Sequence, residues 1–167
     1  PLGPVANVGR RQTRTRLFVA APSVVITRSM NLKDFRPDLH VVLGSGYSGA
    51  FSTLNVRGWQ QVGEIPFATI QTLEPSSVEG HPGKYLVLKN PRGFVMTLQM
   101  GRLHGYEGIP PHKVVQTVLE GHRAGTRRFI LTNASGSTSL TRRPGSAMVL
   151  RDHLNFTGQN PLTGPNR

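Results

Sequence analysis

The fold is indicated most clearly by residues 39–46, which read LHVVLGSG. Residues 39–43 form a short run of apolar and β-branched side chains around His40, and such a run predicts a buried β-strand. The glycines that follow allow a tight turn whose backbone N–H groups are free to bind a ligand. Ligands of α/β sheets gather at this carboxyl end of a strand. Residues 39–46 therefore predict a buried strand that leads into an anion-binding turn.

Two further segments combine glycines with side chains that donate hydrogen bonds. Residues 129–136 read FILTNASG, so that another apolar run leads into a polar turn. Residues 101–108 read GRLHGYEG and carry Arg102, His104 and Tyr106 between glycines. Side chains two positions apart on an extended segment project to the same face, so we expect these three to lie together. Such a set suits an anion with an adjoining hydroxylated group, although a solvated strand edge would explain the pattern equally well.

The middle of the chain predicts extended segments and a hairpin. Residues 58–71 show weak alternation of polar and apolar side chains, with a break at Pro66. Residues 85–88 and 94–98 are mostly apolar and flank Asn90-Pro91-Arg92-Gly93. Turn-forming residues between two apolar runs predict a β-hairpin.

The later part of the chain predicts one helix and two strands. The helix should begin at Pro110-Pro111 and end near Gly125, since proline favours the first helical turn. It would bury an apolar face formed by Val114, Val115, Val118, Leu119 and His122. Residues 129–132 and 147–150 predict strands. The fold class is therefore α/β, with a mixed β-sheet flanked by helices.

The composition excludes several kinds of site. The 167 residues contain no cysteine, which removes disulfides, thiolate zinc sites and a cysteine nucleophile. No apolar run approaches the roughly 20 residues that a membrane-spanning helix needs. His40, His112 and His122 lack the spacing of metal ligands, with one another or with carboxylates. We therefore expect a soluble, cytoplasmic protein that holds no metal.

Residues 1–29 differ from the rest of the chain. The net charge is +12, and no acidic residue precedes Asp34, whereas five arginines do. An arginine-rich, acid-poor terminus is typical of a disordered extension, and also of an organellar transit segment or a nucleic-acid arm. Only Phe18 interrupts this stretch, whereas nucleic-acid modules interleave aromatics with their basic residues. We interpret residues 1–29 as a basic, disordered extension and residues 30–167 as the domain.

Five motifs in a fixed order give a specific resemblance. They are residues 44–46 (GSG), 78–83 (VEGHPG), 101–108 (GRLHGYEG), 133–136 (NASG) and 151–162 (RDHLNFTGQNPL). Together they resemble the trimeric purine nucleoside phosphorylases over about residues 37–167. Ser45 in the first motif resembles the inosine/guanosine branch of that family rather than the methylthioadenosine branch. The resemblance implies a nucleoside-phosphorylase-like fold and a homo-oligomer, namely a trimer.

The resemblance also assigns roles to individual residues. It implies that the backbone N–H of Ala134 binds phosphate together with four side chains, those of Ser45, His81, Arg102 and His104. Of these, His104 would be the catalytic residue. Tyr106 would lie beside the ribose and bond its hydroxyl groups, while Glu107 and Asn133 would support the phosphate loop.

By the same resemblance, the reaction is phosphorolysis of purine (deoxy)ribonucleosides to free base and pentose 1-phosphate, in purine salvage. Orthophosphate would be a co-substrate, and no cofactor would be needed. In this family the residues that recognise the purine lie downstream of the last motif, so we expect the chain to be C-terminally truncated and weakly active or inactive. Two alternatives stay open. One is a catalytically inactive phosphate- or nucleoside-binding module that associates with full-length subunits. The other is a basic nucleic-acid-binding protein, which only the charge of +12 favours.

Overall fold

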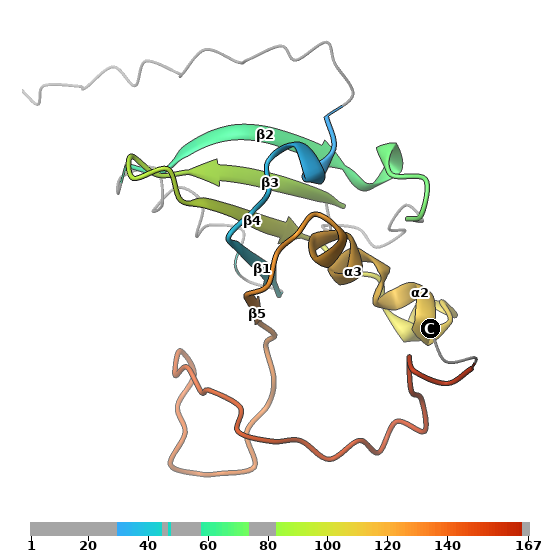
Figure 1. Cartoon of the computed structure of the whole chain (residues 1–167). Coiled ribbons are helices and arrows are strands. Elements are labelled where there is room, and N and C mark those ends of the chain that lie inside the picture. Colours follow the sequence, from blue (N-terminus) through green and yellow to red (C-terminus); the bar gives the residue numbers. More distant parts are fainter. Residues whose placement is uncertain (1–29, 45–46, 48–57, 74–82, 165–167) are drawn as a thin grey trace, which may run out of the picture.

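A five-stranded mixed β-sheet forms the centre of the computed structural model, which describes residues 30–44, 47, 58–73 and 83–164 (Figure 1). The strands are β1 (Leu39–Leu43), β2 (Gln60–Pro66), β3 (Lys84–Lys89), β4 (Val95–Met100) and β5 (Phe129–Leu131). Their order across the sheet is β2-β3-β4-β1-β5. The pairs β2–β3 and β3–β4 are antiparallel, whereas β1 runs parallel to both β4 and β5. The predicted mixed sheet is confirmed.

The predicted hairpin forms between β3 and β4. The side-chain oxygen of Asn90 accepts hydrogen bonds from the backbone N–H groups of Arg92 at 2.9 Å and Phe94 at 3.0 Å. An asparagine that bonds to its own downstream backbone in this way stabilises a tight turn. The extended segment predicted over residues 58–71 forms β2, which ends at Pro66 and continues as the 3₁₀-helix η2 (Phe67–Thr69).

Three short helices lie between β4 and β5 in the chain. They are the 3₁₀-helix η3 (Gly105–Glu107), α2 (Pro111–Val114) and α3 (Gln116–Arg123). Pro111 lies in the first turn of α2, as predicted, and α3 ends just before Gly125. The predicted apolar face is wrong, because α3 buries Thr117, Glu120 and Gly121, whereas Leu119 is exposed. The reason lies in the sheet, which presents polar side chains to this helix.

Side chains on the two faces of the sheet form two apolar clusters. The cluster on the face covered by α3 and the 3₁₀-helix η1 (Leu32–Asp34) contains Leu32, Ile65, Phe67, Leu73, Tyr85, Val87 and Ala124. The cluster on the other face contains Leu86, Leu88, Met96 and Leu98, with Trp59 and Phe94 packed against it. Successive residues of a strand point to opposite faces, which accounts for the separation. Among the described residues, the helices therefore cover one face of the sheet.

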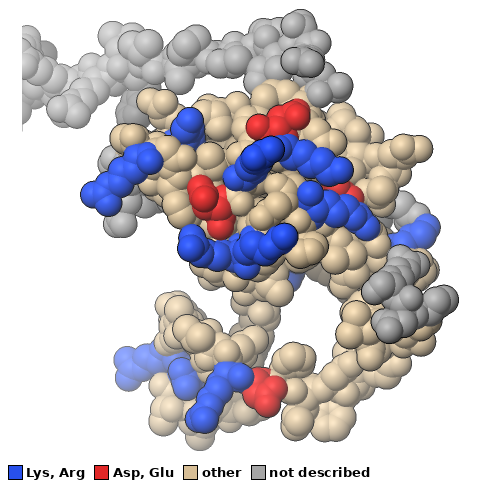
Figure 2. Space-filling model, in the orientation of Figure 1, with Lys and Arg blue, Asp and Glu red and all other residues tan. Residues whose placement is uncertain are grey.

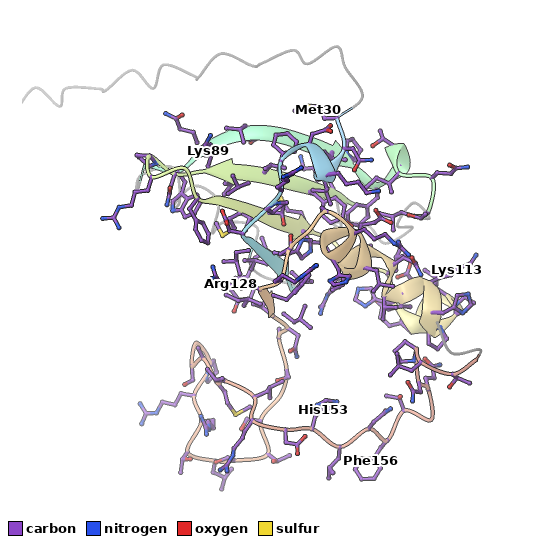
Figure 3. The ribbon with its side chains drawn as sticks, viewed as in Figure 1. Met30, Lys89, Lys113, Arg128, His153 and Phe156 are labelled. Atoms are coloured by element: carbon purple, nitrogen blue, oxygen red, sulfur yellow. The ribbon has the colours of Figure 1, made fainter. Side chains whose placement is uncertain are left out.

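Residues 132–164 form an irregular segment, the C-terminal arm, which leaves the sheet after β5. The arm curves away from the sheet and returns toward α2 (Figure 1). Its large exposed apolar side chains are Leu140, Met148, Val149, Leu150, Leu154, Phe156 and Leu162. Phe156 points away from the sheet (Figure 3). The strand predicted at residues 147–150 does not form, because the described part of the chain places no neighbouring strand beside it.

A buried polar network lies where α3 meets the sheet. His40 is 0% exposed, and its Nε2 lies 3.1 Å from Oε1 of Gln99. Its Nδ1 lies 2.7 Å from the hydroxyl of Thr97. Because an amide oxygen can only accept, we assign the His40 proton to Nε2, and Nδ1 then accepts from the Thr97 hydroxyl. Burial lowers the pKa of His40 below its ordinary value of 6.5, so His40 is neutral in the folded protein at neutral pH.

We predict that acidification destabilises the protein through His40. Since the folded state disfavours the protonated ring, the unfolded state binds more protons below the ordinary pKa of 6.5. The contribution of neutral His40 to the free energy of unfolding is therefore fully present above that pH. It is lost as the pH falls toward the lower pKa of the folded state, by at most about 1.4 kcal/mol per pH unit. Urea unfolding at about pH 7.5 and about pH 5.5 measures this effect. Wild type should lose more free energy of unfolding than His40→Gln, and equal losses would show that His40 does not titrate in this way.

Candidate active site

The carboxyl ends of three strands meet at one edge of the sheet. Because β1 is parallel to both β4 and β5, the three strands run in the same direction and end on the same side. The residues that follow them directly are Gly44, Gly101 and Thr132. The structure thus brings together the points at which the three glycine-containing segments singled out by the sequence leave their strands.

The ends of β1 and β5 are joined through Thr132. Its hydroxyl accepts a hydrogen bond from the N–H of Gly44 at 2.9 Å and donates one to the carbonyl of Val42 at 2.8 Å. A Cβ on Gly44 would lie 2.8 Å from both Cα of Asn133 and the carbonyl oxygen of Thr132. Both neighbours are backbone atoms, so glycine is required for this approach. Thr132 lies in a segment singled out above but is not assigned a role at the site, although a hydroxyl directly after an apolar run is the signal for such a contact.

From the end of β4, Arg102 reaches the hydrogen-bonded contact between the ends of β1 and β5. Its Nη1 donates to the carbonyl of Thr132 at 3.4 Å. Its Nε is buried and has no hydrogen-bond partner among the described residues. Buried donors without partners are uncommon in native proteins, and a guanidinium binds phosphate or carboxylate oxygens strongly. An anion beside Arg102 would satisfy this donor.

His104 and Tyr106 form a stacked pair next along the chain. Their ring centroids are 4.7 Å apart and their planes differ by 16°. The prediction of an extended segment through Tyr106 is wrong, because Tyr106 lies in η3. The helical turn nevertheless brings the two rings together. Tyr106 is 77% exposed, which leaves its side chain accessible to a ligand.

Glu107 stabilises the start of η3. Its Oε1 accepts a hydrogen bond from the backbone N–H of His104 at 3.0 Å, and its own N–H donates to the His104 carbonyl at 3.1 Å. A carboxylate in the first turn of a helix satisfies an N–H group that the helix itself leaves unpaired. Glu107 thereby fixes the backbone that carries His104.

The remaining predicted residues fall into two groups. Asn133 and Ala134 are exposed at the beginning of the C-terminal arm, directly after the joint with Gly44. The side-chain amide of Asn133 donates to the carbonyl of Ala134 at 3.3 Å. Ser45 and His81 lie outside the described residues.

The charged side chains are mostly basic on the face shown in Figure 2. Lys33, Arg36 and Arg123 line a shallow hollow next to the carboxyl end of α3. Cations are favoured there, because the last carbonyls of a helix carry partial negative charge. Within the described ranges, no group of three histidine or acidic side chains could hold a metal ion. No helix in those ranges is long and apolar enough to cross a membrane.

Comparison with known proteins points to one family. The chain is 35% identical over 130 residues to purine nucleoside phosphorylase 1 of Geobacillus stearothermophilus, and 36% identical over 136 residues to the purine nucleoside phosphorylase of Mus musculus. These matches cover 78% and 80% of the chain, and 45% of each relative. The chain thus spans less than half the length of these relatives. A scan against protein-family models found no match.

Solved structures give the same result. Isoform 2 of the purine nucleoside phosphorylase of Schistosoma mansoni superimposes with a TM-score of 0.64 at 26% identity, over 78% of this chain and 45% of the other. A second structure of a purine nucleoside phosphorylase from that organism gives a TM-score of 0.60 at 25% identity, over 78% of this chain and 46% of the other. Sequence and fold therefore agree: the chain belongs to the purine nucleoside phosphorylase family and corresponds to the N-terminal portion of its members.

Proposed function

We propose that this chain provides the phosphate-binding part of a purine nucleoside phosphorylase. The enzyme would convert a purine (deoxy)ribonucleoside and orthophosphate into the free base and a pentose 1-phosphate. The observation that carries the proposal is the meeting of Gly44, Arg102 and Thr132 where three parallel strands end. A structure of the Schistosoma mansoni relative was determined in complex with cytosine and ribose-1-phosphate, a ligand that joins a pentose to phosphate. We therefore expect orthophosphate as co-substrate and no cofactor.

In phosphorolysis, a phosphate oxygen forms a bond to C1′ of the sugar while the bond from C1′ to the base nitrogen breaks. The departing base takes the electron pair and gains a proton. The phosphate dianion must be held in line with C1′, and its charge must be offset by donors that need no rearrangement. We assign this task to the Arg102 guanidinium, to the Ser45, His81 and His104 side chains, and to the backbone N–H of Ala134. His104 is the residue proposed to act on the reacting phosphate.

The stacked pair of η3 extends the proposed site from phosphate to sugar. The accessible Tyr106 side chain lies against His104, so a phosphate bound by His104 would place its attached pentose near the tyrosine. We propose that Tyr106 packs beside the ribose and bonds its hydroxyl groups. Glu107 and Asn133 would support this arrangement through their bonds to the backbone of His104 and Ala134.

Ribose 1-phosphate is the ligand that tests these assignments together. It should raise the melting temperature of the wild-type chain, since a ligand that binds only the folded state stabilises it. Arg102→Ala should remove the shift, and Tyr106→Ala should reduce it. Arg92→Ala is the matched control, because Arg92 lies in the β3–β4 turn at the opposite end of β4 and carries the same charge. The proposal is wrong if ribose 1-phosphate does not raise the melting temperature of wild type, or if it raises that of Arg102→Ala as much as that of Arg92→Ala.

We also propose that the chain self-associates, as a trimer according to its family resemblance. Ile130 and Leu131 of β5 are 49% and 65% exposed, and Phe156 of the arm is 89% exposed. Exposed apolar side chains, and a strand at the edge of the described sheet, favour association between chains. Light scattering over a dilution series should give a mass above that of one chain, falling on dilution. A constant monomer mass would rule this out.

A second candidate is a catalytically inactive phosphate- or nucleoside-binding module that associates with full-length subunits. It rests on the same observation, because the meeting of Gly44, Arg102 and Thr132 would bind phosphate with or without turnover. Both candidates bind phosphate, and only the first turns over a nucleoside. We expect no binding of nucleic acid. The basic cluster of Lys33, Arg36 and Arg123 lies at the carboxyl end of α3, where the helix itself favours cations. Binding of RNA or DNA with a steep salt dependence would overturn that expectation.

A further inference from the structure

A buried amide connects the centre of the sheet to the backbone directly before Arg102. Gln99 of β4 is 0% exposed. Its Nε2 donates to the carbonyl of Gly101 at 3.0 Å and to the hydroxyl of Thr117 in α3 at 3.0 Å. Both N–H groups of the amide are therefore used, one on the loop that carries Arg102 and one on the helix that covers the sheet.

The Gly101 carbonyl fixes the orientation of this amide, and His40 binds its other end. The Nε2–H of His40 donates to the amide oxygen of Gln99, while Nδ1 accepts from the Thr97 hydroxyl. The Gly101 carbonyl can only accept a hydrogen bond, so a reversed amide would place two oxygens against each other. That contact would be repulsive, and both Gln99 and His40 are fully buried. The donors thus have one consistent direction, from Thr97 through His40 and Gln99 to Gly101.

The packing of α3 holds the ring of His40 in this place. A Cβ on Gly121 would lie 2.7 Å from Nδ1 of His40, so the helix backbone lies directly on the imidazole. The rings of Tyr85 and Phe129 flank it at centroid distances of 5.7 Å and 5.5 Å. These neighbours leave the imidazole little freedom to turn away from Gln99.

The Gly101 carbonyl is the point at which the network acts on the candidate site. β4 ends at Met100, and the chain changes direction at Gly101, whose φ is +103°. The carbonyl of Gly101 belongs to the peptide group that also contains the N–H of Arg102. A hydrogen bond to that carbonyl therefore fixes the peptide plane from which the Arg102 side chain starts.

We propose that Gln99, held from behind by His40, is a positioning residue that aims the Arg102 guanidinium at the phosphate. This inference rests on the proposed function, in which Arg102 binds phosphate. Gln99 does not itself touch the ligand. It sets the backbone of Gly101 from the interior, so its removal should weaken phosphate binding while the strands and their pairing persist.

The test compares Gln99→Met with Val87→Ala. Methionine has nearly the shape of glutamine but neither accepts from His40 nor donates to Gly101. Val87 is equally buried on the same face and pairs with Thr97 across β3 and β4, so its truncation disturbs the core beside the network without reaching Gly101. Calorimetric titration with orthophosphate should give a dissociation constant at least about tenfold higher for Gln99→Met than for wild type. Val87→Ala should stay within about twofold of wild type.

Amide hydrogen exchange of the ligand-free proteins is a second, independent measurement of how well the loop after β4 is ordered. Amides of residues 101–104 should exchange faster in Gln99→Met than in wild type, with no such local increase in Val87→Ala. Unchanged exchange there, or phosphate affinity equal to that of Val87→Ala, overturns the inference. If wild type fails to bind phosphate, the proposed function fails, and the exchange data still decide whether Gln99 orders this loop. Should Gln99→Met not fold, Thr97→Val is the substitute, because it removes the hydroxyl that donates to His40. It should raise the dissociation constant of orthophosphate by about threefold.

Discussion

Alone, the 167-residue chain should release hypoxanthine from inosine several orders of magnitude more slowly than its full-length relatives. In the proposed function, the described site provides the phosphate side of the reaction, chiefly through Arg102, whose buried Nε has no partner among the described residues. The family resemblance places the groups that recognise the purine beyond the last motif, and the chain spans 45% of its relatives' length. A base that departs without a stabilising partner raises the barrier steeply. A coupled spectrophotometric assay of hypoxanthine, with and without orthophosphate, measures the rate.

The same assay separates residual catalysis by this site from contamination. Any slow release should require orthophosphate and disappear in Arg102→Ala, whereas Arg92→Ala should retain it. Rapid, phosphate-dependent release by the purified chain would show that these residues already hold the departing base. The expectation of weak activity would then be wrong, while the assignment of the reaction would be strengthened.

Replacement of Gly44 by alanine should be the most damaging single-methyl change at the strand ends. The added Cβ would lie 2.8 Å from two backbone atoms of the turn after β5, so β1 and β5 would have to separate at their carboxyl ends. Overpacking of this kind costs about 1–3 kcal/mol. We also expect Gly44→Ala to lose phosphate-dependent stabilisation, because separation of the strand ends would break the hydrogen bond from the N–H of residue 44 to Thr132 beside the proposed site. Urea unfolding with and without orthophosphate measures both effects.

Gly136 provides the matched control for this substitution. It is a glycine of the C-terminal arm whose added Cβ would meet nothing within 4 Å, so Gly136→Ala should leave the free energy of unfolding nearly unchanged. If Gly44→Ala proves as stable as Gly136→Ala, the two strand ends are not packed as closely as the structure indicates.

Much of the sheet could be predicted from local sequence, for physical reasons. The apolar run at residues 39–43 and the hairpin around Asn90 depend on neighbours only a few positions away, and both form. Prediction fails where the outcome depends on distant partners. Residues 147–150 have a strand-like composition, but a strand needs a neighbour, and the described residues bring none to it. The face that α3 buries is likewise set by the polar surface beneath it rather than by its own Val118 and Leu119.

The candidate site divides in the same way. That the segments after β1, β4 and β5 meet follows from parallel strands alone, so glycine-rich turns after apolar runs were sufficient to locate the edge. The hydrogen bond between His40 and Gln99 joins residues 59 positions apart, and no local sequence pattern predicts it. The register that sets His40 beside Thr97 is visible only in the assembled sheet. A histidine inside an apolar strand was the one available hint.

The claim that the carboxyl edge of β1, β4 and β5 binds orthophosphate is tested most directly by isothermal titration calorimetry. Orthophosphate is titrated into the wild-type chain, Arg102→Ala and Arg92→Ala under identical salt and pH. We predict saturable binding, with one site per chain, by wild type and by Arg92→Ala, and no measurable binding by Arg102→Ala. Binding that survives the loss of Arg102, or its absence from the wild-type chain, would contradict the claim.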